Sequence, residues 1–312
     1  MFSLLAPAKI NLYLKVSYRR PDGYHEIDTV MQAISLFDRL SFYPDSKLRV
    51  LTKGRRIPQK DNLVTKALDL LKAYTGVKKG ICVVIEKKIP VAAGLGGGSS
   101  DAAAALMGAC HLWQIPAKLS LLSFLGSQIG SDVPFFFTSG QARAQSRGEI
   151  LSPYPLPVDY RLALVCPKFS ISTPWAYREL NLPLTSPNPA GNFLRTKKEK
   201  VIGEDLRNST HALHFSNDLE APVIRRFPEI EGIKKAFLAA GWEPALMSGS
   251  GPAVWAAFPK NMEGKKLPRQ KERPAAMIRK LLAQSGITTK FDLFVVRPLI
   301  SCANAPVGGQ PA

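Results

Sequence analysis

A glycine-rich stretch near the middle of the chain is the clearest candidate for chemistry. Four glycines and two serines fall within residues 90–101, after a β-like run at 81–85 and before an alanine-rich run at 102–105. Alanine favours helix, so the order strand, glycine loop, helix is predicted. Glycines let the backbone turn tightly, and the first N–H groups of a helix lack intrahelical partners and attract anions. The stretch therefore predicts a phosphate site.

Two other phosphate-binding patterns do not fit this stretch. A Walker-type loop needs Gly-Lys-Ser/Thr, which the stretch lacks, and a dinucleotide fingerprint starting at Gly94 fails because residue 99 is serine. The signatures of protein kinases are also missing. The ordinary alternative is a glycine turn in which Ser99 or Ser100 simply caps the helix.

Two further sets of side chains could take part in a reaction. Lys9 and Asn11 share one face of a strand predicted over residues 8–16, about 7 Å apart, where an ammonium and an amide could orient a polar substrate. Asp132 precedes the apolar run 135–137, and burial beside such residues can tune a carboxylate to act as a base. Taken singly, Lys9 and Asn11 fit a solvated strand face better than a site, and Asp132 fits a cap or turn aspartate better than a base.

Two turns complete the set of candidates. A second glycine turn covers residues 247–251 and could also receive phosphate, although such turns commonly connect a helix to a strand. Tyr24 and His25 follow a Pro-Asp-Gly turn at 20–23, where an aromatic ring and an imidazole could stack on a base and hydrogen bond to it.

Hydrophobic periodicity predicts the elements that must position these residues, and it alternates between strand and helix along the chain. Strands are predicted at 8–16, 27–34, 81–85, 160–165, 253–258 and 291–296, and helices at 61–74, 119–129, 233–240 and 275–283. A rise in proline density at 153–157 predicts a domain joint. We therefore expect domains at residues 1–156 and 157–302, followed by a flexible tail at 303–312.

Composition excludes several classes of protein. The 312 residues contain no apolar run near the roughly 20 residues of a membrane span and no signal-type leader. Four scattered cysteines fit neither a zinc site nor a disulfide framework, so a reducing compartment, the cytoplasm, is expected. The net charge of +18 suits an anionic partner, and much of it lies in a basic stretch at 259–285. That stretch has no aromatic residue for base stacking, which disfavours nucleic-acid binding.

Three motifs occur in the order seen in the GHMP kinases. They are Pro-Ala-Lys-Ile-Asn at 7–11, Pro-x-x-x-Gly-Leu-Gly-Gly-Gly-Ser-Ser at 90–100 and Met-Ser-Gly-Ser-Gly-Pro at 247–252. The chain resembles this family, which includes galactokinase, homoserine, mevalonate and phosphomevalonate kinases. Segments at 20–32, 130–136 and 217–220 are similar to members that act on a cytidine-diphosphate-linked methylerythritol. The resemblance covers about residues 6–258 and fades through the basic stretch, which looks like an insertion.

The resemblance implies a two-domain α+β fold with the active site in the interdomain cleft. It also implies ATP-dependent phosphorylation of the 2-hydroxyl of that cytidylyl sugar alcohol in the non-mevalonate isoprenoid pathway. Lys9 and Asp132 match the family's catalytic pair, with Asp132 as base or electrostatic orienter and Lys9 as its partner. The oligomeric state is not predicted.

The remaining family positions are ligand-binding ones. ATP is expected at Lys87, Pro90, Gly94, Leu95, Gly96, Gly97, Gly98, Ser99, Ser100, Ser248, Gly249, Ser250 and Gly251, with Mg²⁺ near Ser99 or Ser100. The sugar-alcohol substrate is expected at Asn11, Tyr24, His25 and Tyr177, the two tyrosines forming a stacking sandwich around the base.

Two alternatives stay open at this point. Another GHMP kinase, for homoserine or mevalonate, is disfavoured by the Asp-Gly-Tyr-His segment at 22–25, because those substrates carry no base to stack. A basic nucleic-acid-binding protein with decayed kinase motifs is disfavoured by the intact Lys9, Asp132 and glycine turns.

Overall fold

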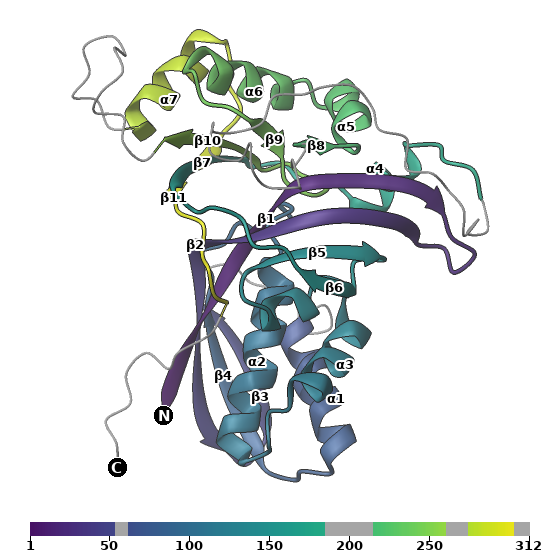
Figure 1. Cartoon of the computed structure of the whole chain (residues 1–312). Helices are drawn as coiled ribbons and strands as arrows, with labels where there is room; N and C mark the ends of the chain where they lie inside the picture. Colours follow the sequence, from purple (N-terminus) through teal and green to yellow (C-terminus); the bar gives the residue numbers. More distant parts are fainter. Residues whose placement is uncertain (54–61, 185–214, 260–273, 303–312) are drawn as a thin grey trace.

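Two β-sheets form the framework of the computed structural model, which describes residues 1–53, 62–184, 215–259 and 274–302. Figure 1 shows them as two units joined along the long strands β1 and β2. The first sheet contains β1 (Phe2–Arg19), β2 (His25–Asp45), β3 (Leu48–Lys53), β4 (Gly80–Glu86), β5 (Gln141–Ser146), β6 (Ile150–Pro153) and β8 (Ser216–Asn217). Its order is β3-β4-β2-β1-β8, with β5 pairing with β2 and β6 with β5.

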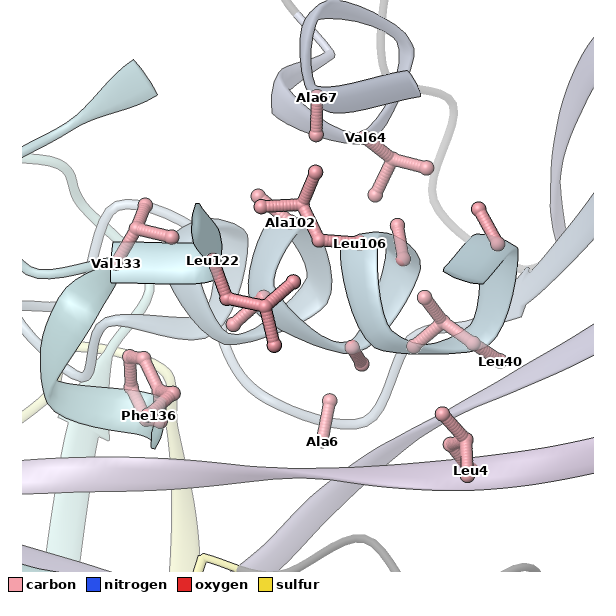
Figure 2. Close-up of a cluster of buried hydrophobic side chains, with 14 of the residues drawn as sticks. Leu4, Ala6, Leu40, Val64, Ala67, Ala102, Leu106, Leu122, Val133 and Phe136 are labelled. Atoms are coloured by element: carbon pink, nitrogen blue, oxygen red, sulfur yellow. The ribbon is translucent and has the colours of Figure 1, made fainter. Parts of the chain in front are cut away.

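Helices cover one face of the first sheet and fill its core. They are α1 (Leu63–Thr75), α2 (Gly97–Trp113), α3 (Leu119–Ile129) and the short 3-10 helix η2 (Pro134–Phe137). Figure 2 shows Ala102 and Leu106 of α2 between side chains of the sheet and of the other helices. The alanines at 102–105 are fully buried, and their small side chains let α2 lie close to the sheet.

Local signals account for the ends of these helices. The Asn62 side chain accepts a hydrogen bond from the N–H of Val64 (3.0 Å) and caps α1. Gly130 follows the last residue of α3, where a glycine commonly marks the end of a helix. α2 begins earlier than its alanines suggest, because Gly96 occupies the cap position with φ = +66°. Ser99 and Ser100 therefore lie inside the first turn and do not cap the helix.

The second sheet has the order β11-β7-β10-β9 and is antiparallel throughout. Its strands are β7 (Tyr160–Pro167), β9 (Ala245–Met247), β10 (Val254–Pro259) and β11 (Phe291–Val296), and the helices of this half are α4 (Thr173–Arg178), α5 (Glu220–Arg226), α6 (Glu229–Ala239) and α7 (Pro274–Gln284). The predicted strands and helices of this half are confirmed; α4, α5 and β9 were not predicted.

One strand contributes to all three hydrophobic clusters formed by the described residues. Phe2 and Leu4 of β1 lie in the core of the first sheet, whereas Ile10 and Leu12 lie in a cluster between the two sheets. Leu14, further along the same strand, packs into the core of the second sheet. A β-bulge between Pro7 and Ala8 interrupts the pairing with β2 where the strand passes from the first cluster to the next.

Several expectations lie wholly or partly outside the described residues. They include the tail at 303–312, nearly all of the long loop with some helix that the polar residues 184–210 predict, and residues 260–273 of the basic stretch. The part of that stretch from 274 to 284 is helix α7, whose Ile278 and Leu282 are buried in the second core. Within the described ranges, no helix combines the length and apolar character needed to cross a bilayer.

Candidate active site

Lys9 and Asn11 of β1 form a buried polar pair beside a carboxylate. Lys9 Nζ donates to Asn11 Oδ1 (2.7 Å) and lies 3.3 Å from Asp132 Oδ2. The Lys9 side chain is 5% exposed and that of Asp132 36% exposed, so the ammonium is enclosed while the carboxylate remains accessible. Asn11 Nδ2 in turn donates to Thr29 Oγ1 (2.8 Å), which fixes the orientation of the amide. This arrangement can hold an ionised carboxylate against a hydroxyl group.

Asp132 reaches this position because its neighbours are anchored. It lies in the turn between α3 and η2, and Val133, Phe135 and Phe136 pack into the core of the first sheet. The apolar run thus fixes the backbone on one side of the turn and leaves the carboxylate facing the cavity.

A cavity of about 980 Å³ contains this pair and most of the other predicted residues. The predicted residues in its lining are Lys9, Asn11, Tyr24, His25, Gly94, Gly96, Ser99, Asp132, Tyr177, Gly249, Ser250 and Gly251. The start of helix α2 and both glycine turns therefore border the same space as the Lys9–Asp132 pair. An anion at the helix start would meet backbone N–H groups there.

Five residues of the predicted phosphate loop are absent from that lining. Leu95 is buried in the cluster between the sheets, and Ser100 is 1% exposed. Ser99, by contrast, lines the cavity, so of the two serines it is the one that a ligand in the cavity could reach. The others outside the lining are Pro90, Gly97 and Gly98.

Ser248 lies in a different environment from the predicted one. It is fully buried, and its Oγ donates to the carbonyl oxygen of Gly94 (2.9 Å). Ser248 Oγ also accepts a hydrogen bond from the backbone N–H of Asn11 (3.4 Å). Ser248 therefore joins β1 to both glycine turns, and the neighbouring residues Gly249–Gly251 face the cavity instead.

Lys87 also lies away from the cavity. Its side chain is 4% exposed, and its ammonium forms ion pairs with Asp38 and with Asp101 (2.8 Å). The expectation that Lys87 contacts the nucleotide is not supported by this geometry, because both carboxylates and the start of α2 enclose the ammonium.

Aromatic residues gather at the other end of the cavity. The rings of His25 and Tyr177 lie 5.0 Å apart at 34°, whereas Tyr24 is 53% exposed and lies beneath the guanidinium of Arg147 (5.0 Å). The two tyrosines line one cavity, but the direct ring contact is with His25 rather than between them. Burial, with a contribution from Arg19, lowers the pKa of His25, so its ring stays neutral at neutral pH. Burial raises the pKa of the Tyr177 hydroxyl.

Three arginines in the lining were missed by the sequence reasoning. Arg19, Arg147 and Arg178 lie at the end of β1, after β5 and at the end of α4. They surround the aromatic end, where they favour an anionic ligand. Arg178 directly follows Tyr177, which is the one local signal that could have identified it.

Comparison with known families agrees with this architecture. The model for "GHMP kinases N terminal domain" matches residues 62–140, and that for "GHMP kinases C terminal" matches residues 198–284. Together these matches span more than half of the chain.

Curated relatives narrow the assignment. A 4-diphosphocytidyl-2-C-methyl-D-erythritol kinase of Thermodesulfovibrio yellowstonii is 40% identical over 273 residues, covering 85% of this chain and 93% of the relative. A protein of the same name from Gloeobacter violaceus is 40% identical over 258 residues, covering 81% and 84%.

Solved structures agree in fold. A crystal structure of 4-(cytidine 5'-diphospho)-2C-methyl-D-erythritol kinase is 30% identical, with a TM-score of 0.69 over 95% of this chain and 99% of that one. A homoserine kinase from Cytophaga hutchinsonii has a TM-score of 0.67 at 16% identity, covering 98% and 97%, and shares the fold. The chain therefore belongs to the GHMP kinases and, within them, to the 4-diphosphocytidyl-2-C-methyl-D-erythritol kinases.

Proposed function

We propose that the chain transfers the γ-phosphoryl group of ATP to the 2-hydroxyl of 4-diphosphocytidyl-2-C-methyl-D-erythritol, a step of the non-mevalonate isoprenoid pathway. The observation that carries the proposal is the Lys9–Asp132 pair, which shares one cavity with the start of α2 and the aromatic group around His25. The names of the relatives supply the substrate, and the cavity has the polar and aromatic ends that such a substrate needs.

Asp132 accepts the proton of the 2-hydroxyl in this proposal. The hydroxyl oxygen forms a bond to the γ-phosphorus while the bond to the bridging oxygen breaks, and ADP leaves. Lys9, held by Asn11 at 2.7 Å, pairs with the carboxylate and stabilises negative charge near the transferred group. Positioning and charge stabilisation account for most of the catalysis of phosphoryl transfer.

The N–H groups at the start of α2 receive the triphosphate, together with Gly249–Gly251 from the second turn. Mg²⁺ fits the lining because the hydroxyl of Ser99 offers a hard oxygen, and it would neutralise phosphate charge when bound. The described residues contain no cluster of three or more His, Cys, Asp or Glu, so phosphates and water would supply most of its ligands.

The cytidine base is expected against Tyr24, His25 and Tyr177, where a neutral His25 can hydrogen bond to it. Arg19, Arg147 and Arg178 lie where they can pair with the diphosphate of the substrate. The four cysteines are free and buried, which supports a reducing compartment, the cytoplasm, as the site of action.

Substitution of Asp132 tests the mechanism directly. Asp132→Asn keeps the size of the side chain and removes the base, so kcat is expected to fall by about 10²- to 10⁴-fold. The dissociation constant for ATP should stay unchanged, because the helix start and the turns are untouched. An assay of ADP release, coupled to a reporter enzyme, measures turnover, and calorimetry measures binding.

The matched control is Asp292→Asn, which removes a carboxylate from a surface ion pair with Lys168 on the second sheet. The same ADP assay, run with mevalonate and with homoserine in place of the cytidylyl substrate, tests the substrate. Near-normal turnover of Asp132→Asn, or a preference for either of those two alcohols, would contradict the proposal.

A further inference from the structure

Three buried charged residues beneath the glycine-rich loop have no part in the chemistry described above. Asp38, Lys87 and Asp101 have side chains that are 0%, 4% and 3% exposed, and none of them lines the cavity. They come from three segments: strand β2, the chain just after β4, and the second turn of α2. We call this set the loop-base cluster.

The contacts of the loop-base cluster hold both ends of the loop. Lys87 lies at the start of the loop, and its Nζ donates to Asp38 and to Asp101 Oδ2 (2.8 Å). The other oxygen of Asp38 accepts the backbone N–H groups of Lys88 (2.5 Å) and Ile89 (2.9 Å). Asp38 thus fixes the backbone where the chain leaves β4, and Lys87 links that point to helix α2 through Asp101.

The first helical residue after the loop rests directly on this cluster. A Cβ built at Gly97 would lie 2.8 Å from Ile89 Cγ2 and 3.4 Å from Lys87 Nζ. A shift of the Lys87 side chain would therefore displace the backbone of Gly97, where the free N–H groups of α2 begin.

Stability alone does not account for three charges in this place. Burying an ion pair costs desolvation energy, and apolar side chains of similar volume often serve the fold as well or better. The cluster also holds two carboxylates for one ammonium, and burial raises the pKa of Asp101 accordingly. Directional contacts, by contrast, fix relative positions more sharply than apolar packing does.

We propose that Asp38, Lys87 and Asp101 form a positioning device, which sets the distance and orientation between the end of β4 and the start of α2. Through that spacing it aims the backbone N–H groups of the glycine-rich loop at the triphosphate. The inference rests on the proposed ATP site. Lys87 and Asp101 are positioning residues in it, because they act through the loop and do not touch the reacting atoms.

Asp101→Asn is the first test, because it keeps the shape of the side chain and leaves Lys87 paired with Asp38. Calorimetric titrations with ATP and with inorganic tripolyphosphate, both with Mg²⁺, compare a ligand that has a base with one that has none. We expect the variant to bind both ligands about tenfold more weakly. The KM for the cytidylyl substrate should stay unchanged, because that ligand occupies the aromatic end of the cavity.

A double-mutant cycle tests whether the residues act as one device. Lys87→Met and Asp101→Asn are measured singly and together; the double variant leaves Asp38 with its two backbone donors. If Lys87 acts through Asp101, the double variant will lose less tripolyphosphate binding free energy than the two single variants lose when their losses are added. Lys234→Met is the control, since it removes an ammonium from an ion pair with Glu220 in the second half of the molecule. Its tripolyphosphate affinity should equal that of the unmodified chain.

The outcomes separate this inference from the proposed function. If Asp101→Asn weakens the binding of ATP but not that of tripolyphosphate, the loop-base cluster acts on the nucleoside, and the positioning role is wrong. The proposal is also wrong if the losses in tripolyphosphate affinity of Lys87→Met and Asp101→Asn simply add in the double variant. It is wrong as well if Asp101→Asn loses no more affinity than the control Lys234→Met. If the unmodified chain binds neither ATP nor tripolyphosphate, the ATP site itself is wrong, whatever the variants do.

Discussion

At the scale of single residues, the two glycine turns meet at a point that has no room for a side chain. Gly94 has φ = +76°, and a Cβ there would overlap the carbonyl oxygen of Ser248. The Ser248 hydroxyl closes the contact by donating to the carbonyl oxygen of Gly94. The approach of one turn to the other therefore depends on a residue without Cβ.

Gly94→Ala should separate the turns. The strained φ and the overlap together are expected to lower the free energy of unfolding by about 1–3 kcal/mol. Gly98→Ala is the control, because its Cβ would meet Leu63 Cδ1 at 3.5 Å, an ordinary contact inside a helix. Thermal unfolding of the two variants checks the prediction, and equal melting temperatures would show that the turns do not pack as described.

Asp101 should also leave a signature in the pH dependence of stability. Burial raises its pKa to about 7, against the opposing charge of Lys87 and with support from Asp38. An unfolded chain releases this proton at about pH 4, so between about pH 4 and about pH 7 the folded state binds more protons than the unfolded one. The contribution of Asp101 to stability therefore falls as the pH rises through that window.

Asp101→Asn removes the titrating carboxyl group, so comparing the variant with the unmodified chain isolates the contribution of that group to the pH dependence of stability. The difference in unfolding free energy between variant and unmodified chain should shift in favour of the variant from about pH 4 to about pH 7 and then stay constant. Urea unfolding at several pH values measures this difference. A difference that is the same at every pH would contradict the raised pKa.

At the scale of elements, local signals were enough wherever periodicity and end residues agreed. Helix α3 has its predicted bounds, 119–129, because its apolar residues have helical spacing and Gly130 follows its end. Strand β11 has its predicted bounds, 291–296, because its residues alternate as in a strand. α4 and α5 are helices of six and seven residues, too short for a periodic pattern to emerge. β9 has three residues and depends on pairing with β10.

The same division applies to the candidate site. Alternation along β1 places Lys9 and Asn11 on one face, and the glycine pattern marks the start of α2. The setting of Ser248 and Lys87 could not be derived this way, because it comes from contacts with residues far away in the chain, Gly94 and Asp38. Local sequence identifies a phosphate-binding turn, but tertiary packing decides which of its members face the ligand.

At the scale of the whole molecule, we propose that the chain consists of two units that divide at 156/157, after the proline-rich joint. Apart from Cys302, which is buried in the first core, the buried residues of the two cores follow this division with one exception, strand β1. Its Leu14 and Val16 pack into the second core, and it pairs with β8. The second unit is therefore incomplete without the first residues of the chain.

Separate expression of residues 1–156 and 157–312 tests this dependence. We expect the second fragment to lack a cooperative unfolding transition by itself, because its core lacks the β1 side chains. Mixing the two fragments should restore the cooperative transition and the kinase activity. This mixture is the control, because it shows whether dividing the chain at 156/157 by itself prevents folding. A second fragment that unfolds cooperatively alone would show that β1 contributes little to that core.

The path of β1 through three cores has a consequence for biosynthesis. Asn11 emerges from the ribosome long before its partners Ser248 and Trp255, which are translated more than two hundred residues later. Until then Leu14 and Val16 have no core to enter. A nascent chain therefore carries β1 without these partners until the second sheet has been made, and the site around Asn11 is complete only after that.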